Sequence, residues 1–376
     1  MPEKDEGSVL AKNPALGYTD TKFIPKGDRP VLAEYRRALH EIPELDWDVP
    51  ETGNYLKKVL AKLDCRIFEP CPGAVCAYFD LGKPETMAVR GEMDALPLEE
   101  KTGLPFASRH PGKMHACGHD GHMAMALGLG ENLSGAAKNL LLIFQPAEET
   151  TGGAKAVCDT GILEKYHVTE IYGIHLWPDL PRGTVAASPR GMMARSCEVT
   201  AEFTGRSAHI AKREEGTDAL LPAAEFLLEA EKIRREFPCV LGFGKLSAGS
   251  ARNAVADFAR LEGTLRCHDD GIFYEIKKRL EKAAPSLCRL HFSTGYPPME
   301  NNEALLKRAE KLFPVEEAEP SFLTDDFSEY LRRVPGVFFR LGTGGPALHT
   351  PEFDFDEAVL DTGLSLYRSL LTGERL

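Results

Sequence analysis

The hydrophobic positions in the first half of the chain form short apolar runs that alternate with helical stretches. Four apolar runs have the length expected of buried strands, at residues 74–81, 87–93, 140–144 and 171–176. Residues 123–133 have the spacing of a helix, and two amphipathic helices come earlier, one after a cap at Asp28 and one from Pro50. This alternation predicts an α/β fold with a central, mostly parallel sheet flanked by helices.

The pattern changes after residue 186. A strictly alternating segment at residues 197–203 is followed by a long helix, two strands, a second helix and a strand. These later elements span residues 217–237, 240–246, 254–265, 271–282 and 288–292. The order is typical of a two-layer α+β domain, so we expect residues 187–298 to be an insertion. Residues 28–186 and 299–376 would together build the catalytic domain. The second of these two segments is expected to contain a helix, a strand and a helix.

Composition and charge exclude several classes of protein. The 376 residues are 43% hydrophobic and 27% charged, which predicts an ordinary globular protein of about two domains. A net charge of −12 disfavours nucleic acids and anionic membranes as partners. We expect residues 1–27 to be a polar arm, since they lack the apolar core of a signal peptide. No apolar run has the roughly 18 residues of a membrane span, so we expect a cytoplasmic protein. The nine cysteines lack close spacing and are expected to be reduced.

Three histidines, a cysteine and an aspartate fall within residues 115–122. From a turn, Cys117 and His119 can reach one metal ion, since thiolate and imidazole suit zinc and similar cations. A helix start capped by Asp120 would require neither the cysteine nor the histidines. An alternative chemistry, a Cys117 nucleophile activated by a histidine, stays open at this point.

A second polar cluster follows the strand expected at residues 140–144. Glu148 and Glu149 stand at the carboxyl end of this strand, where open α/β sheets bind ligands. One carboxylate can ligate a metal while its neighbour takes a proton from water, although an acidic helix start is the alternative. His175 closes the strand expected at residues 171–176, and His349 follows the strand expected at residues 337–341. Together, the five candidate ligands and one free glutamate suggest a hydrolase with two adjacent cations. A non-catalytic metal-dependent binding protein is another possibility.

Seven short motifs carry a resemblance to a known family, in the order in which that family has them. They are residues 36–40, 43–45, 93–97, 115–122, 144–149, 173–175 and 349–351. With these residues the chain resembles the metallopeptidases of peptidase family M20. It is most similar to the amidohydrolase branch, which includes hippurate hydrolases, auxin-conjugate hydrolases and N-acetyldiaminopimelate deacetylases. The resemblance runs from about Arg36 to the C-terminus.

The resemblance implies a hydrolase of linear amides that acts on a small N-acyl amino acid. It implies Glu148 as the general base and two divalent metal ions per subunit, with zinc, manganese or cobalt as candidates. The implied ligands are Cys117, His119, Glu149, His175 and His349. The inserted domain would be a lid that forms a homodimer, with His209 donating to the oxyanion across the dimer. Asn253 and Arg266 would face the substrate, where a guanidinium suits a carboxylate.

Finer matches concern the substrate. Residues 99–108, 295–302 and 326–331 resemble the branch members that remove an acetyl group from N-acetyldiaminopimelate in lysine biosynthesis, so this is the leading substrate. The alternative is a broad N-acyl amino acid or dipeptide hydrolase. The chain departs from the family after His209, where Lys212 and Arg213 stand in place of a second histidine. It also has residues 324–327 as Thr-Asp-Asp-Phe instead of Gly-Glu-Asp-Phe.

Overall fold

A computed structural model describes residues 32–375, so the expected N-terminal arm and the cap at Asp28 lie outside the described residues. An eight-stranded mixed sheet has the strand order β1-β2-β4-β3-β5-β12-β6-β11. Its strands are β1 Arg66–Phe68, β2 Val75–Phe79, β3 Thr86–Glu92, β4 Asn139–Gln145, β5 Val168–Trp177, β6 Val185–Ala187, β11 Glu316–Glu317 and β12 Gly336–Gly342. The four central strands β4, β3, β5 and β12 are parallel to one another. The predicted α/β class is therefore confirmed.

The central strands are almost entirely buried, and among them only Thr169 of β5 is exposed. Every residue of β3, β4 and β12 is buried, as expected for parallel strands covered by helices. The flanking helices are α1 Leu32–His40, α2 Pro50–Leu60, α3 His119–Glu131, α4 Gly153–Asp159, α5 Ile162–Lys165, α8 Glu303–Leu312, α9 Ser328–Leu331 and α10 Val359–Thr372. Helix α3 packs against β3, β4 and β5 and is itself contacted by α1 and α10. This packing fixes the first residues of α3 close to the ends of the central strands.

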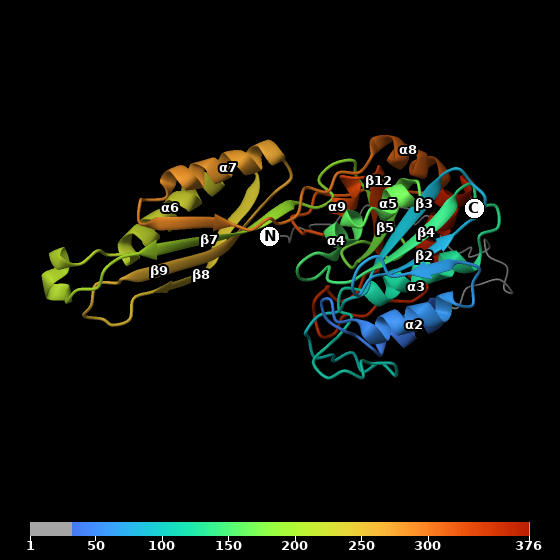
Figure 1. Cartoon of the computed structure of the whole chain (residues 1–376), viewed down its shortest axis with the longest axis horizontal. Helices are drawn as coiled ribbons and strands as arrows, with labels where there is room; N and C mark the ends of the chain where they lie inside the picture. The colour runs from blue at the N-terminus through green and yellow to red at the C-terminus, as the bar shows by residue number, and fades with distance from the viewer. Residues whose placement is uncertain (1–31, 376) are drawn as a thin grey trace, which may run out of the picture. The chain divides into compact units, whose positions relative to one another are not determined.

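A second sheet is antiparallel and has the strand order β10-β7-β9-β8. Its elements are β7 Arg195–Thr204, a 3-10 helix η1 Ile210–Glu215, α6 Leu220–Glu236, β8 Cys239–Ala248, β9 Phe258–Cys267, α7 Asp270–Ala283 and β10 Cys288–Phe292. Helices α6 and α7 lie along one face of this sheet (Figure 1). Alternate residues of β7, such as Val199 and Phe203, pack with Phe226 and Ile276 of these helices. The expected order of strand, helix, two strands, helix and strand is confirmed.

Two element boundaries in the inserted domain differ from the sequence prediction. Residues 254–257 were expected to open a strand, but β9 begins only at Phe258. The backbone before it is used otherwise, because Ala254 forms a bridge with His209. Helix α6 begins at Leu220 instead of residue 217, since Thr217 is paired with Arg206. Backbone pairing between loops therefore competes with the local helix and strand pattern.

Within residues 32–375, no helix combines the length and the apolar character that crossing a membrane requires. The same range contains all nine cysteines of the chain, and each of them is free.

Candidate metal centre and active site

The predicted ligands gather at the carboxyl ends of the central strands. Glu149 follows β4, His175 lies near the end of β5, and Cys117 and His119 flank the start of α3. His349 comes from the connection between β12 and α10. Because parallel strands end at the same edge of a sheet, residues far apart in the sequence meet there.

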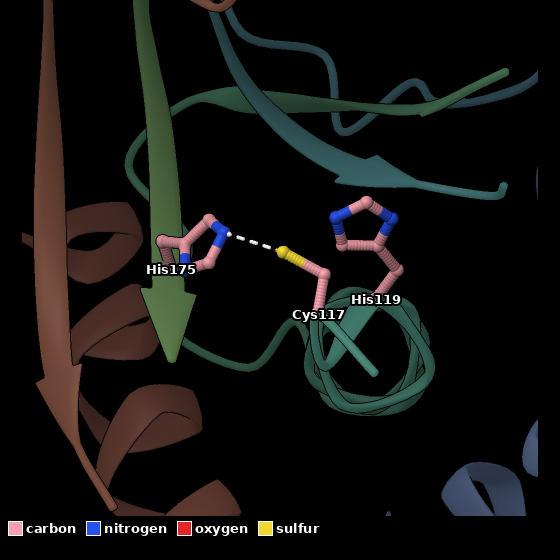
Figure 2. A group of neighbouring side chains, drawn as sticks. All are labelled: Cys117, His119 and His175. Atoms are coloured by element: carbon pink, nitrogen blue, oxygen red, sulfur yellow. Dashed lines mark hydrogen bonds between the residues drawn. The ribbon is translucent and has the colours of Figure 1, made fainter. Parts of the chain in front are cut away.

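The thiol of Cys117 lies at the centre of this group. Its Sγ atom is 3.4 Å from Nε2 of His175 and 3.3 Å from Nε2 of His349. Figure 2 shows the imidazoles of His175 and His119 on either side of the sulfur. Nε2 of His349 is also 3.3 Å from Oε1 of Glu149. The ligand atoms of Cys117, His119 and His175 lie within 4.8 Å of one another, which is close enough for a shared cation.

Hydrogen bonds orient two of the imidazoles for metal binding. Nδ1 of His119 is 2.7 Å from the backbone oxygen of Asp94, and Nδ1 of His175 is 2.7 Å from that of Leu176. A carbonyl oxygen can only accept, so both Nδ1 atoms carry the hydrogen and both Nε2 atoms keep a lone pair. Metal-binding histidines have this arrangement. Nε2 of His119 is buried and has no hydrogen-bond partner in the described part of the chain, so the donor set fits divalent cations.

The turn that carries Glu148 and Glu149 is held by Asp94. The two carboxylate oxygens of Asp94 accept hydrogen bonds from the backbone N–H groups of Glu148 and Glu149, each at 3.0 Å. The preceding residue, Ala147, has a left-handed φ of 58° and donates its N–H to the backbone oxygen of Asp46. A non-glycine residue keeps such a conformation only when its surroundings impose it. The turn is therefore fixed by contacts from two other segments.

The two adjacent glutamates have opposite electrostatic environments. Burial raises the pKa of Glu148 well above its usual range, and the charges of Asp325 and Glu149 raise it further. Burial also acts to raise the pKa of Glu149, but a hydrogen bond to His349 and the electrostatic effect of the neighbouring histidines outweigh it and lower the pKa to about 2. Oε2 of Glu148 lies 3.9 Å from Nε2 of His119. Glu149 is thus suited to stay ionised as a ligand and Glu148 to accept a proton.

The environment of Cys117 does not suit a nucleophile. Burial raises the pKa of its thiol well above the usual range, and the charges of Glu149 and Glu148 add to the shift. A reactive cysteine requires the opposite shift, because the thiolate is the nucleophile. A coordinating cation would deprotonate the thiol outright. The geometry therefore favours Cys117 as a ligand.

Next to the proposed ligands, a group of buried polar side chains form hydrogen bonds and ion pairs with one another. Nδ1 of His122 donates to Glu92 at 2.9 Å, and its Nε2 accepts from a backbone N–H of β5 at 2.9 Å. Glu92 also pairs with the buried guanidinium of Arg90. Arg90 contacts two further carboxylates, those of Asp325 and Asp326. Both ring nitrogens of His122 are occupied by these hydrogen bonds, and its ring packs against the rings of His119 and His175, so this histidine supports the site from beside the proposed ligands.

Asp120 has a different role from the helix cap considered above. The residue that caps α3 is Gly118, in a left-handed conformation with a φ of 83°. A Cβ atom at this position would lie 2.8 Å from the side chain of Leu176, so only glycine fits. The carboxylate of Asp120 instead accepts from Arg36 at 3.3 Å and from His40 at 2.8 Å. These buried contacts anchor the first turn of α3 to α1.

The inserted domain carries the three remaining predicted site residues. His209 is exposed, precedes η1 and accepts a hydrogen bond from a backbone N–H at Nδ1. The backbone oxygen of Asn253 accepts from Ile210, which makes Asn253 and His209 neighbours. Arg266 on β9 donates from Nη1 to the backbone oxygen of Phe322. Within residues 32–375, no hydrogen bond or ion pair joins these three side chains to the ligand cluster, and their roles stay predictions.

A mixed sheet whose parallel central strands end at a cluster of possible metal ligands and a buried glutamate is the arrangement of an α/β metallohydrolase. Residues 88–373 match peptidase family M20/M25/M40, and the chain belongs to this family. The family and the class of enzyme predicted from the sequence are thereby confirmed.

Relatives with curated names cover nearly the whole chain. The chain is 35% identical over 367 residues to an N-acetyldiaminopimelate deacetylase of Streptococcus pneumoniae (strain CGSP14), covering 90% of this chain and 98% of that relative. It is 36% identical over 357 residues to one of Lactococcus lactis subsp. cremoris (strain SK11), covering 88% and 95%. Among solved structures, a dinuclear metal binding peptidase of the M20 family from Bacillus subtilis is similar, with a TM-score of 0.81 and 28% identity, covering 93% of this chain and 98% of that chain.

Proposed function

We propose that the protein is a metal-dependent amidohydrolase that removes the acetyl group from N-acetyldiaminopimelate and releases acetate and the free diamino acid. The observation that carries the reaction is the Nε2 atom of His119, which has no hydrogen-bond partner among residues 32–375 and lies 3.9 Å from Oε2 of Glu148 and 3.9 Å from Oε1 of Glu149. The choice of substrate is supported by the curated relatives of that name.

The five clustered side chains would hold two divalent cations, with zinc, manganese or cobalt as candidates. The proposed ligands are Cys117, His119, Glu149, His175 and His349. When bound, such cations lower the pKa of water toward about 7 and polarise the amide carbonyl. The mixed set of thiolate, imidazole and carboxylate ligands supports this assignment, as does the orientation of the imidazoles.

The protein's own groups would move the proton and hold the substrate. Glu148 takes a proton from the attacking water and returns it to the leaving nitrogen, a transfer that its buried, acidic surroundings favour. His209 would donate a hydrogen bond to the oxyanion of the tetrahedral intermediate. Asn253 and Arg266 would bind the amino acid part of the substrate. Arg266 donates from Nη1 to the backbone oxygen of Phe322, and a guanidinium has further N–H groups that suit a carboxylate.

We also propose that the inserted domain, residues 187–298, forms a homodimer. Its edge strand β8 exposes Val240 and Leu246, which are 38% and 46% exposed. On the adjacent helix α6, Leu228 is 65% exposed. An exposed apolar edge strand is a surface that a second copy can cover by strand pairing. In such a dimer, the partner subunit's His209 would complete each active site.

An assay panel tests the proposed reaction. Metal-free protein is reconstituted with Zn²⁺, Mn²⁺ or Co²⁺ and supplied with N-acetyldiaminopimelate, N-acetylcysteine, hippurate or a dipeptide. We expect no turnover without metal and the highest kcat/KM with N-acetyldiaminopimelate. Preference for hippurate or the dipeptide would replace this substrate by the broader N-acyl amino acid or dipeptide class. Metal binding without turnover of any compound would instead indicate a binding protein.

A further inference from the structure

A tyrosine from outside the ligand cluster contacts the turn that carries Glu148. Tyr296 lies in the segment after β10 and exchanges two backbone hydrogen bonds with Ser196, each of 3.1 Å. Its hydroxyl donates to the backbone oxygen of Thr150 at 3.4 Å. A Cβ atom at Gly152 would lie 2.7 Å from Cε1 and 3.0 Å from the hydroxyl oxygen of Tyr296. The aromatic ring therefore occupies the space directly over Gly152.

The surroundings of Tyr296 keep its hydroxyl protonated. Burial raises its pKa far above the usual range, and the negative charges of Asp326 and Glu148 raise it further. Tyr296 can thus donate a hydrogen bond and offer an apolar surface, but its hydroxyl is not poised to act as a base near neutral pH. Its contribution to the site must come from packing and position.

Other segments hold the turn at its beginning and middle. Asp94 and Asp46 bind backbone N–H groups of residues 147–149, as described above. Nε1 of Trp47 donates to Oγ1 of Thr151 at 2.9 Å. At Gly152, which has a φ of 82°, the three atoms nearest to a Cβ position all belong to Tyr296. Tyr296 therefore covers the last residue of the turn on its Cβ side, while the N–H of Gly152 donates to the backbone oxygen of Ala147 at 2.8 Å.

We propose that Tyr296 is a positioning residue for the reaction. Its ring covers Gly152, closes the turn and keeps the carboxylate of Glu148 where it accepts the proton. Because Tyr296 is paired with Ser196 in the first strand of the inserted domain, both chain connections to that domain are tied to the turn. The inference rests on the proposed function, since it takes Glu148 as the base. A displacement of a reacting group by about 1 Å can lower the rate 100-fold.

Two substitutions separate the contribution of the aromatic ring of Tyr296 from that of its hydroxyl group. Tyr296→Phe keeps the ring, and we expect its kcat to stay within about threefold of wild type, since a hydrogen bond of this length contributes little. Tyr296→Ala removes the ring and should lower kcat about 10- to 100-fold, with KM and metal content unchanged. Tyr274 on α7 is a matched control, because its hydroxyl also takes part in one hydrogen bond of 3.4 Å, from Arg195. Tyr274→Phe and Tyr274→Ala should keep wild-type kcat.

A second readout does not depend on turnover. In the metal-free protein, hydrogen–deuterium exchange of a peptide covering residues 148–154 should be faster in Tyr296→Ala than in wild type and unchanged in Tyr296→Phe. Gly152→Ala should lower kcat because its methyl group collides with the ring. Adding Tyr296→Ala to it removes the collision, so the double variant should be no slower than the slower single variant.

The outcomes distinguish this inference from the proposed function. If wild type hydrolyses the amide but Tyr296→Ala keeps its kcat and its exchange rate, the positioning role is overturned and the proposed function stands. A change confined to KM, or a loss of metal, would also overturn it. If metal-loaded wild type turns over no substrate, the proposed function fails, and unchanged exchange in Tyr296→Ala would then refute the contact by itself.

Discussion

The sulfur of Cys117 lies 3.4 Å from Nε2 of His175, where burial and acidic neighbours disfavour a free thiolate. A thiol in this position is a poor nucleophile but becomes a strong ligand when a cation is present. The hypothesis that Cys117 binds a metal and the hypothesis that it is a nucleophile therefore make opposite predictions about chelators and alkylating agents.

We expect chelation to abolish turnover and added Zn²⁺, Mn²⁺ or Co²⁺ to restore it. Cys117→Ala should lower the metal bound per subunit, measured by elemental analysis of the dialysed protein. Cys71, a half-buried cysteine, provides the control, since Cys71→Ala should leave the metal content unchanged. Turnover that resists chelators but is lost on alkylation with iodoacetamide would identify a cysteine nucleophile instead.

Replacing Glu148 should separate catalysis from metal binding. In Glu148→Gln the side chain cannot take a proton, and we expect kcat to fall about 10²- to 10⁴-fold with metal content unchanged. In Glu149→Gln a proposed ligand is weakened, so metal content should fall together with activity. Near-normal activity of Glu148→Gln would remove this residue from the role of base.

His209 should act across the dimer. His209→Ala is expected to remain dimeric in sedimentation and to lose about 10²- to 10³-fold in kcat, the effect of one missing oxyanion donor. Unfolded and refolded in equal mixture with Glu148→Gln, it should regain about a quarter of wild-type activity. Half of the dimers would then be mixed, and each would have one complete site. Without such a gain, His209 does not act on the neighbouring subunit.

Asp94 should stabilise the fold as well as the site. Asp94→Asn replaces one acceptor oxygen by a donor that faces a buried backbone N–H, which costs about 1–3 kcal/mol in the free energy of unfolding. Urea denaturation of the metal-free protein measures this loss. Asp80 also accepts a backbone hydrogen bond, but in an exposed turn, so Asp80→Asn should change stability by less than about 0.5 kcal/mol. Equal losses in the two variants would show that the turn of Glu148 does not depend on Asp94.

His40 should make stability depend on pH. Burial acts to lower its pKa, but hydrogen bonds to Asp120 and Glu100 outweigh burial and raise it to about 9. A pKa raised above the unfolded value of about 6.5 adds stability in full below pH 6.5, and this contribution is lost as the pH rises through 9. The difference in unfolding free energy between metal-free wild type and His40→Gln should therefore be large at pH 6 and shrink by pH 10. A difference independent of pH would mean that His40 is not charged in the folded protein.

The sequence was sufficient to select the proposed ligands as candidates, but it was insufficient for the contacts that orient them. Cysteine and histidine at strand ends are rarely needed for packing, so Cys117, His175 and His349 could be selected from residue type and place alone. Asp94 could not be given its role in this way, because its partners Glu148 and Glu149 are 54 and 55 residues away. The contact of Tyr296 with Thr150 spans 146 residues and depends on the folded path of the chain.

The same limit applies to the fold. Long apolar runs predicted the central strands, because strands that are buried on both faces have apolar residues at consecutive positions. Strand β6 has three residues and β11 has two, which is too few to establish a period. Strand β6 forms by pairing with β12, and β11 forms by pairing with β6. The start of β9 was misplaced for a related reason, since Ala254 pairs with His209.

The spread of the proposed ligands along the chain has a consequence for the order of assembly. Cys117 and His349 are 232 residues apart, and their side chains meet only when β12 has joined β5. The unfolded chain therefore has no metal site with the affinity of the folded protein. In a small zinc finger, by contrast, the ligands are close in sequence. Metal would be loaded into an already folded apoprotein and would then stabilise the fold through linkage, without being needed to initiate folding.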